Sequence, residues 1–304
     1  MMTSLPDGLA VALTGFGLPQ PNQARRAERG VQNEVWVLEF PTERLVLKHF
    51  RRGDSASLRR VACVMDQVRS GLPVPELRPC GGGRVLETAW GCFTLSEHAR
   101  GVQPDRSALT PRHAAAMGRA LARLHLQPDV SDVDLPLELP APATPVVLPV
   151  LGGLISEITG ESRGDQEVRE HLRARWEWLR AHADDPPLVP RRTRLVHGDF
   201  TDANLFFADG EVSAVIDWDQ THLGCPEHEL IRAAHLSFVD RAELWAAFLQ
   251  AYRAARPLDL DELDAAAEAY AYRRDRGLWV FQELYVRGNE AVRHYLPGGR
   301  CQAD

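Results

Sequence analysis

The sequence predicts an α+β fold in two lobes, a small strand-rich lobe followed by a larger, mostly helical one. Two short β-rich runs, Val35–Leu38 and Leu45–Lys48, occur early in the chain and are joined through a turn at Pro41. From Glu229 onward, apolar residues instead recur at helical spacing. A chain of 304 residues is also near the size at which one hydrophobic core divides into two. We therefore expect an N-terminal lobe over residues 1–94, a hinge over 95–101 and a C-terminal lobe over 102–304.

The first apolar segment is predicted to be a helix that packs on the N-terminal lobe. Leu9–Leu13 is short, follows Asp7, and has no basic residue before Arg25, so it makes a poor signal peptide. No run in the sequence approaches the ~18 apolar residues needed to span a bilayer. The five cysteines are odd in number and include no Cys-x-x-Cys, which argues against a disulfide framework or a zinc ribbon. We therefore expect a cytoplasmic protein.

The second early strand is predicted to carry a functional lysine. Leu45–Leu47 has the composition of a buried strand, and Lys48 ends it. Lys48 is the single lysine among 35 lysine and arginine residues, so the chain keeps a compact point charge at this position instead of a guanidinium. The plainer alternative is an edge-strand lysine that only improves solubility.

The C-terminal lobe is predicted to be helical apart from one connection. Six prolines lie between Gln127 and Val150, which argues against a long helix and favours an extended segment there. The aromatic residues of the later helices are interpreted as core. The apolar residues at helical spacing in this part are Leu244, Phe248 and Leu249, then Trp279, Leu284 and Val286.

The residues that carry chemistry stand in three fragments, His197-Gly198-Asp199-Phe200, Asn204 and Ile216-Asp217-Trp218-Asp219. Asp199 and Asn204 have the interval of the protein-kinase catalytic loop, and Asp217 ends an apolar segment, where kinases carry the aspartate that holds Mg²⁺. Short β-rich runs flank the fragments, with a turn signal at Ala208–Glu211. Each fragment alone is common in turns, but the three in this order predict that both aspartates project from one edge.

Phosphoryl transfer explains why these residue types are needed. An attacking hydroxyl needs a carboxylate that orients it and accepts its proton, a role that suits Asp199. Mg²⁺ prefers oxygen ligands and keeps several waters, so the carboxylate of Asp217 and the amide oxygen of Asn204 suffice beside phosphate oxygens. The sequence therefore indicates a kinase without a dedicated metal cage.

On these residues, the chain resembles the aminoglycoside phosphotransferase and choline kinase family from roughly Gly30 to Leu236. Leu72–Pro75 resembles the family's turn after the N-lobe helix, and Met117–His125 resembles its first large C-lobe helix. The resemblance implies a bilobal protein-kinase-like fold. It also implies phosphoryl transfer to a small molecule, as in homoserine, thiamine and fructosamine kinases.

The resemblance also implies roles in the reaction centre. Asp199 would be the catalytic base, and Asn204 and Asp217 would hold Mg²⁺. His197 and Asp219 would line the site.

For the nucleotide, the resemblance implies five further contacts. Lys48 would meet the phosphates, and Gly30 and Asn33 would belong to the loop that covers them. In the hinge, the backbone of Glu97 and Ala99 would bind adenine.

Two positions depart from the kinase pattern. Kinases pair the strand lysine with a glutamate of the N-lobe helix, but the segment Ser57–Ser70 contains no glutamate. Asp66 could take this role with a shorter reach, or another acid could steer Lys48. Later in the chain, Glu229 precedes a leucine where the family often has aspartate, which keeps the carboxylate.

Two alternatives belong to other functional classes. A non-catalytic nucleotide-binding or scaffold protein would fit the missing helix glutamate, although Asp199, Asn204 and Asp217 are all intact. A metallohydrolase would leave Lys48 unexplained, and its histidine spacings match no standard zinc motif. Its metal ligands would be His197, Asp199, Asp217, His222, His228 and His235.

The sequence thus predicts a kinase that requires Mg²⁺ and transfers phosphate from ATP, or alternatively GTP, to a hydroxyl of a small molecule. The formal charge of −7 argues against a nucleic-acid partner, because such proteins present a basic face. No membrane partner is expected, and neither the acceptor nor the oligomeric state follows from the sequence.

Overall fold

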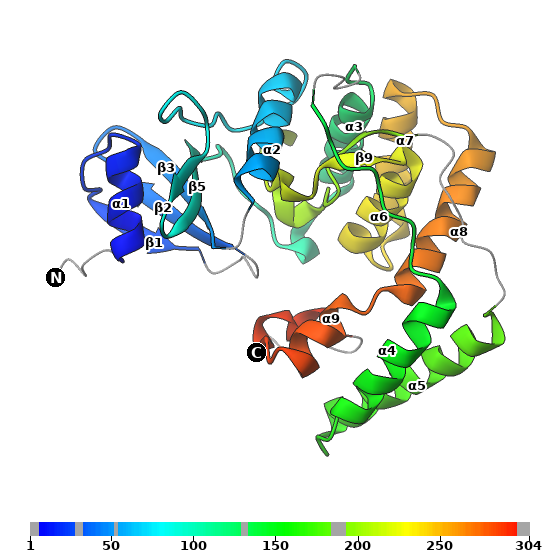
Figure 1. The fold of residues 1–304 in the computed structure, drawn as a ribbon. Coiled ribbons are helices and arrows are strands. Elements are labelled where there is room, and N and C mark those ends of the chain that lie inside the picture. Colours follow the sequence, from blue (N-terminus) through cyan, green and yellow to red (C-terminus); the bar gives the residue numbers. More distant parts are fainter. Residues whose placement is uncertain (1–5, 28–32, 52–53, 129–132, 184–192, 297–304) are drawn as a thin grey trace. The chain divides into compact units, whose positions relative to one another are not determined.

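The computed structural model describes residues 6–27, 33–51, 54–128, 133–183 and 193–296 (Figure 1). The chain divides into two compact units. The first contains Met1–Glu138 and Arg191–Leu263, and the second contains Leu139–Pro190 and Asp264–Asp304.

The first unit begins with an antiparallel sheet of five strands in the order β1-β2-β3-β5-β4. The strands are β1 (Gln23–Arg26), β2 (Glu34–Glu39), β3 (Arg44–Phe50), β4 (Leu86–Thr88) and β5 (Gly91–Glu97). The predicted hairpin is therefore formed by β2 and β3, and Lys48 pairs with Val35 on one side and Thr94 on the other. Lys48 lies in a central strand, so the solubilising edge-strand alternative is wrong.

Strand alternation decides which way Lys48 faces. Leu45 and Leu47 pack with Leu9 and Leu13 of α1 (Asp7–Gly15), which confirms the predicted packing helix. Lys48 and Phe50 point to the opposite face, where the Lys48 ammonium lies 5.0 Å from the centre of the Phe50 ring.

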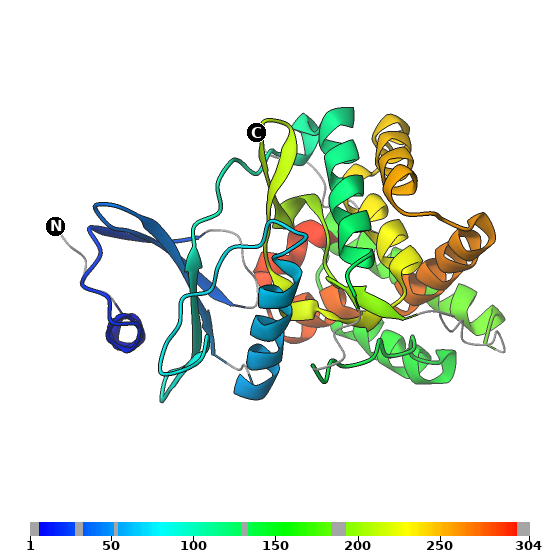
Figure 2. The ribbon, with the colours of Figure 1, turned by 90° about the horizontal axis from the view of Figure 1, so that it is seen from above.

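The other face of the sheet is covered by α2 (Ser55–Val68), and Figure 2 shows α1 and α2 on opposite sides. The side chain of Asp54 begins α2 by accepting hydrogen bonds from the backbone N–H groups of Ala56 and Ser57. Leu58 of α2 then packs in one cluster with Phe50. Lys48 therefore faces the same side of the sheet as α2.

The rest of the first unit is mainly helical, and α3 and α7 cross closely at its centre. Gly118 of α3 makes this approach possible, because a Cβ atom there would lie 2.2 Å from the carbonyl oxygen of Phe248. The predicted helix at Met117–His125 is the C-terminal part of α3. The helices of this part are η1 (Arg106–Ala108), α3 (Pro111–His125), η2 (Asp202–Asn204), η3 (Trp218–Gln220), α6 (Pro226–Phe238) and α7 (Ala242–Ala255).

Short strands frame the three predicted fragments. They are β6 (Arg194–Val196), β7 (Leu205–Ala208), β8 (Glu211–Val215) and β9 (His222–Gly224). β7 pairs with β8 through a two-residue turn in which Asp209 and Gly210 both have positive φ, 53° and 75°. This geometry matches a type I′ turn and confirms the turn expected at Ala208–Glu211.

The second unit corrects one prediction about the proline-rich segment. α4 (Thr144–Glu157) begins inside this segment and contains Pro149 in its interior. Pro145 occupies the first turn, where a missing N–H costs nothing, and a long apolar run continues the helix beyond Pro149. Buried packing of this run outweighs the local proline penalty, so the expectation of an extended segment is wrong from Thr144 onward.

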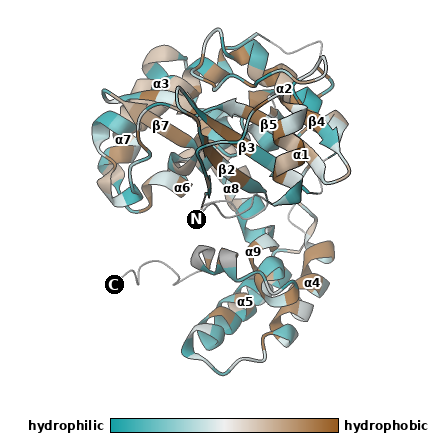
Figure 3. Cartoon of the chain, turned by 90° about the vertical axis from the view of Figure 1, so that its left-hand side faces the viewer, coloured by the Kyte–Doolittle hydropathy of each residue, from teal (hydrophilic) through white to brown (hydrophobic). Residues whose placement is uncertain are grey.

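The remaining helices follow the second part of the chain. They are α5 (Arg163–Ala181), α8 (Leu260–Arg276), α9 (Trp279–Phe281), the π-helical turn η4 (Gln282–Val286) and the 3₁₀ turn η5 (Glu290–Tyr295). In Figure 3, α4 is mostly brown and α5 mostly teal, since α5 is rich in arginine and glutamate. Trp279 is 42% exposed, so its assignment to the core is wrong, whereas Phe248 is fully buried. None of the described helices is long and apolar enough to cross a membrane.

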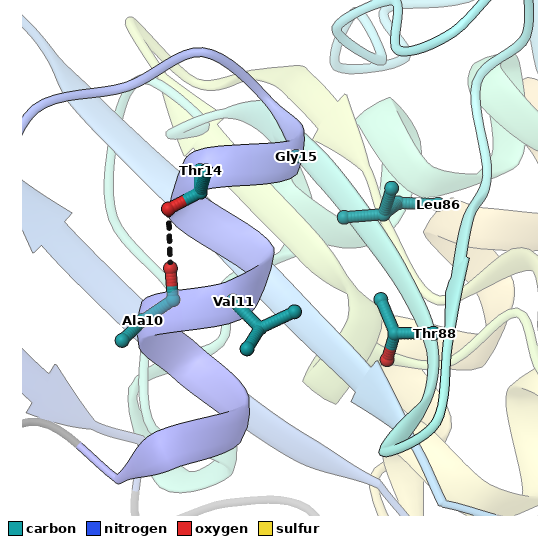
Figure 4. Close-up of a pocket in the computed structure, with 6 residues that line it drawn as sticks. All are labelled: Ala10, Val11, Thr14, Gly15, Leu86 and Thr88. Carbon is teal, nitrogen blue, oxygen red and sulfur yellow. Dashed lines mark hydrogen bonds between the residues drawn. The ribbon is translucent and has the colours of Figure 1, made fainter.

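A shallow apolar depression of about 460 Å³ lies beside α1 (Figure 4). Its lining residues are Ala10, Val11, Thr14, Gly15, Leu86 and Thr88. The Thr14 hydroxyl is already bonded to the carbonyl oxygen of Ala10 at 3.1 Å. None of these side chains is charged or titrates near neutral pH, so the depression lacks the acids and bases that the three fragments contain.

Candidate active site

Lys48 brings the sheet and the third fragment together. Its Nζ atom lies 2.6 Å from Oδ1 of Asp217 and 2.6 Å from Oδ2 of Asp219. Burial alone would lower the pKa of Lys48, but the two carboxylates outweigh it and raise the pKa above the usual value. A lysine and two acids that are about 170 residues apart in the chain therefore form one charged cluster.

The backbone after β8 aims both acids at Lys48. Asp217 has a left-handed conformation (φ 65°, ψ 57°), which aspartate tolerates better than most residues, and η3 begins directly after it. Trp218 anchors this turn, since its ring is buried and its Nε1 donates to the carbonyl oxygen of Val215 at 3.0 Å. Burial raises the pKa of Asp219, whereas Lys48 outweighs burial and lowers that of Asp217.

The identity of the acid that partners Lys48 is thereby settled for the described structure. Asp66 of α2 pairs with Arg84 at 3.2 Å, so the expectation that Asp66 could partner Lys48 is wrong. The other expectation, a different acid, is confirmed by Asp217 and Asp219.

One residue of the loop expected to cover the phosphates also reaches this cluster. Asn33 donates from Nδ2 to Oδ2 of Asp219 at 2.8 Å, so the loop ends beside the lysine. Gly30 lies outside the described residues. The predicted nucleotide contacts of both residues stay predictions.

In the predicted catalytic loop, residues 197–204, Asn204 fixes Asp199. Its Nδ2 donates to the backbone oxygen and to Oδ2 of Asp199, each at 2.9 Å. The Asn204 carbonyl oxygen also accepts from the N–H of Ile216 at 3.0 Å, which ties the loop to the segment that carries Asp217. Both side-chain bonds use the amide nitrogen, so neither uses the amide oxygen. Asn204 and Asp217 thus offer the hard oxygen donors that fit Mg²⁺.

The buried carboxylate of Glu229 holds the loop through its backbone N–H groups. Oε1 accepts from the N–H of Gly198 at 2.6 Å, and Oε2 accepts from the N–H of His197 at 3.2 Å. His125 lies 2.9 Å from Oε2 through its Nε2 atom. Burial would raise the pKa of Glu229, but the hydrogen bond and charge of His125 outweigh it and lower the pKa. Gly198 is required here, because its φ is 81° and a Cβ atom would lie 2.2 Å from the Gln220 carbonyl oxygen.

His197 is a structural residue of the loop. Its ring is completely buried, which lowers its pKa and keeps the imidazole neutral. Nδ1 accepts from the N–H of Asp199 at 3.2 Å, and Nε2 lies 2.9 Å from the carbonyl oxygen of Ile216. One neutral tautomer satisfies both bonds, so the ring orders the backbone around Asp199 and offers no nitrogen to a metal.

The histidines of the metallohydrolase alternative do not gather in the part of the chain that the structure describes. His222 Nδ1 lies 2.7 Å from the carbonyl oxygen of Gln220, and His228 Nδ1 lies 3.0 Å from Glu138. Across the described ranges, no three His, Cys, Asp or Glu side chains are placed to hold a metal ion together.

Sequence reasoning missed Arg232, which contacts the proposed base directly. Its Nη2 donates to Oδ1 of Asp199 at 2.9 Å from helix α6. Arg232 follows Glu229 by three residues, so both lie on the same face of α6, next to the catalytic loop. This helical spacing from Glu229 is the signal that could have identified it.

The first residues of the segment expected to be the hinge belong to a strand. Leu95, Ser96 and Glu97 are still part of β5, and the N–H of Glu97 donates to the carbonyl oxygen of Glu76 at 3.1 Å. Ala99 lies just beyond the strand. The contacts of Glu97 and Ala99 with adenine stay predictions.

Comparison with known proteins identifies several relatives. The chain is 26% identical over 267 residues to a homoserine kinase from Acidiphilium cryptum, an alignment that covers 85% of this chain and 80% of that protein. The structure resembles a spectinomycin phosphotransferase solved with ADP and spectinomycin, with a TM-score of 0.67, 13% identity, and coverage of 99% and 92% of the two chains. It also resembles a macrolide 2′-phosphotransferase from Brachybacterium faecium, with a TM-score of 0.58, 20% identity, and coverage of 98% and 99%.

These likenesses confirm the predicted fold class, a protein-kinase-like α+β fold with a small antiparallel sheet and a larger helical part. Residues 23–270, which are most of the chain, match the sequence model of the phosphotransferase enzyme family. The cluster around Lys48 and the loop around Asp199 both fall inside this range. The chain belongs to the phosphotransferase enzyme family.

Proposed function

We propose that the protein transfers the γ-phosphate of ATP, or alternatively GTP, to a hydroxyl of a small molecule. The observation that carries this proposal is the convergence of Lys48 with Asp217, next to an Asp199 that Asn204 fixes through two hydrogen bonds. Phosphoryl transfer needs positioning and electrostatic stabilisation, and these residues supply a cation, a base and oxygen donors at one place.

In this reaction the acceptor hydroxyl attacks the γ-phosphorus while the bond to the bridging oxygen breaks and the nucleoside diphosphate leaves. Asp199 orients the hydroxyl and takes its proton, because its carboxylate is fixed before the acceptor arrives. Lys48, steered by Asp219, meets the phosphate oxygens, and Asn33 lies beside it. Asn204 and Asp217 would hold Mg²⁺, which neutralises phosphate charge when bound.

The phosphate donor is proposed from the related structures. One related structure was solved with ADP, which supports a nucleoside triphosphate as the phosphate donor. The related proteins act on acceptors as different as homoserine, spectinomycin and macrolides, so the acceptor is proposed only as an alcohol.

A coupled assay of ADP release over amino alcohols, hydroxy acids, aminoglycosides, sugars and nucleosides tests the proposal. We expect turnover with at least one acceptor, and Asp199→Asn should abolish it because an amide cannot accept the proton. Asp209→Asn is the matched control, since this residue lies in the β7–β8 turn with positive φ, which asparagine also adopts.

Two results would separate the alternatives. Mg²⁺-dependent nucleotide binding without any turnover would favour a non-catalytic nucleotide-binding protein. Zinc retained after dialysis, with no nucleotide effect, would favour a metallohydrolase.

A further inference from the structure

Arg232 places a positive charge directly on the proposed catalytic base. Its Nη2 donates to Oδ1 of Asp199 at 2.9 Å, and its side chain remains 31% exposed. Asp199 is 34% exposed, so the ion pair borders solvent at the place where an acceptor must approach.

Fixing Asp199 does not by itself require a guanidinium. Asn204 already holds the Asp199 backbone oxygen and Oδ2 at 2.9 Å each. Arg232 contacts the other carboxylate oxygen and also carries a buried Nη1 that has no hydrogen-bond partner among the described residues. Because Nη1 is buried, a further oxygen partner from solvent meets the part of the Arg232 side chain that stays 31% exposed, and carboxylates and phosphates match the planar fork of a guanidinium.

The position of the reacting hydroxyl limits what that partner can be. The hydroxyl must come within about 2.6–3.2 Å of the Asp199 carboxylate. Because Arg232 is bonded to the same carboxylate, substituents on the carbon atoms near this hydroxyl come within reach of the guanidinium. The positive charge of Arg232 also compensates the negative charge of Asp199, so this carboxylate attracts an ammonium group less than an unpaired carboxylate would.

We propose that Arg232 determines acceptor specificity by binding an anionic group, a carboxylate or a phosphate, that the acceptor carries near its reacting hydroxyl. This inference rests on the proposed function and narrows its acceptor to a hydroxy acid or phosphorylated alcohol. The γ-phosphate of ATP is the other anion that approaches Asp199. The experiment therefore distinguishes binding of the acceptor's anionic group from binding of the γ-phosphate.

The test uses the full chain with ATP and Mg²⁺ and three alcohols that differ chiefly in charge, 4-hydroxybutyrate, 4-hydroxybutanamide and 4-amino-1-butanol. We expect kcat/KM for the anion to exceed that for the neutral amide by roughly 10- to 100-fold, as for a charge-assisted contact, with the cation lowest. Arg232→Gln, which can still donate to Asp199, should remove this preference. Arg232→Lys should keep part of it because it keeps the charge.

Arg119→Gln is the matched control. Arg119 is 35% exposed and pairs with Glu211 at 2.6 Å, so its loss removes a comparable ion pair from helix α3. It should retain the preference for the anion. Thermal unfolding of each variant shows whether any loss of activity reflects loss of the fold.

Four results would overturn the inference. The first is equal kcat/KM of the wild type for the three alcohols, and the second is a uniform loss of kcat/KM over all three in Arg232→Gln. The third is an effect of Arg232→Gln mainly on the KM for ATP and on acceptor-independent hydrolysis. The fourth is ATP hydrolysis by the wild type with none of the three alcohols phosphorylated. The second result would leave Arg232 as an anchor of Asp199, and the third would assign it to the γ-phosphate. In the first three cases an alcohol is still phosphorylated and the proposed function stands, whereas complete absence of Asp199-dependent ATP turnover would overturn both.

Discussion

Replacing Glu229 with glutamine should loosen the catalytic loop and lower the stability of the protein. The carboxylate accepts from Gly198 N–H at 2.6 Å and His197 N–H at 3.2 Å, and it contacts His125 at 2.9 Å. In Glu229→Gln one carboxylate oxygen becomes an NH₂ group, which cannot accept a hydrogen bond from the buried N–H groups. The bonds that remain are weaker, because they are made to a neutral amide instead of a charged carboxylate. Hydrogen bonds to charged groups contribute about 1.5–3 kcal/mol each, and we expect a net loss of about 3 kcal/mol.

Thermal and urea unfolding measure this loss. A loss of 3 kcal/mol corresponds to a fall in Tm of about 5 °C, because the unfolding entropy of 304 residues is about 0.64 kcal/mol/K. Glu211→Gln makes the same chemical change at a side chain that is 57% exposed, so its Tm should change little. A destabilisation of Glu229→Gln no larger than that of Glu211→Gln would refute the reasoning.

The pH dependence gives a second readout of the same contacts. The pKa of Glu229 is lowered in the folded protein, so the unfolded chain binds this proton more readily. The stabilisation by the carboxylate is therefore fully present above the ordinary glutamate pKa of about 4.3 and is lost as the pH falls through the lower folded pKa. The difference in unfolding free energy between wild type and Glu229→Gln should shrink over that acidic range, and a difference independent of pH would contradict the charge-based account.

Three further changes have defined outcomes. Lys48→Arg should lower kcat/KM for ATP at least tenfold, because a guanidinium cannot replace a point charge between Asp217 and Asp219; unchanged kinetics would contradict this. Asp219→Asn should raise the KM for ATP more than it lowers kcat, since Lys48 and Asn33 both lose an anionic partner, and steady-state kinetics would show the reverse split if Asp219 acts in the chemical step. Gly118→Ala should cost about 1–3 kcal/mol in urea unfolding because a Cβ atom meets a backbone oxygen at 2.2 Å, and a neutral effect would mean that α3 and α7 separate easily.

The residues of the proposed reaction centre could be singled out from the sequence. Asp199, Asn204 and Asp217 are identifiable because phosphoryl transfer needs these residue types in a local order, and Lys48 because the chain contains no second lysine. The structure places Lys48 against Asp217, which fits the proposed nucleotide site. The turn at Asp209 could also be predicted, because Asp-Gly favours positive φ at both positions.

Contacts between distant elements could not be predicted in the same way. Arg232 meets Asp199 only because α6 packs beside the loop that carries Asp199; its spacing from Glu229 places it on the same helix face but does not name Asp199 as its partner. The partner of Lys48 comes from η3 instead of α2, since Asp66 is already engaged by Arg84. Pro149 shows a second kind of error. The rule that proline disfavours a helix interior is valid locally, but burial of the apolar face of α4 outweighs it.

The single lysine has a practical consequence for chemical labelling. Apart from the N-terminal amine, Lys48 is the one primary amine that the sequence contains. Its raised pKa and its two carboxylate partners keep it protonated and shielded, so an amine-selective reagent should modify it slowly. The rate of mono-acylation, read by intact mass, therefore reports on one defined position in the proposed nucleotide site. A ligand that draws Asp217 or Asp219 away from the ammonium would be detected as a change in that rate.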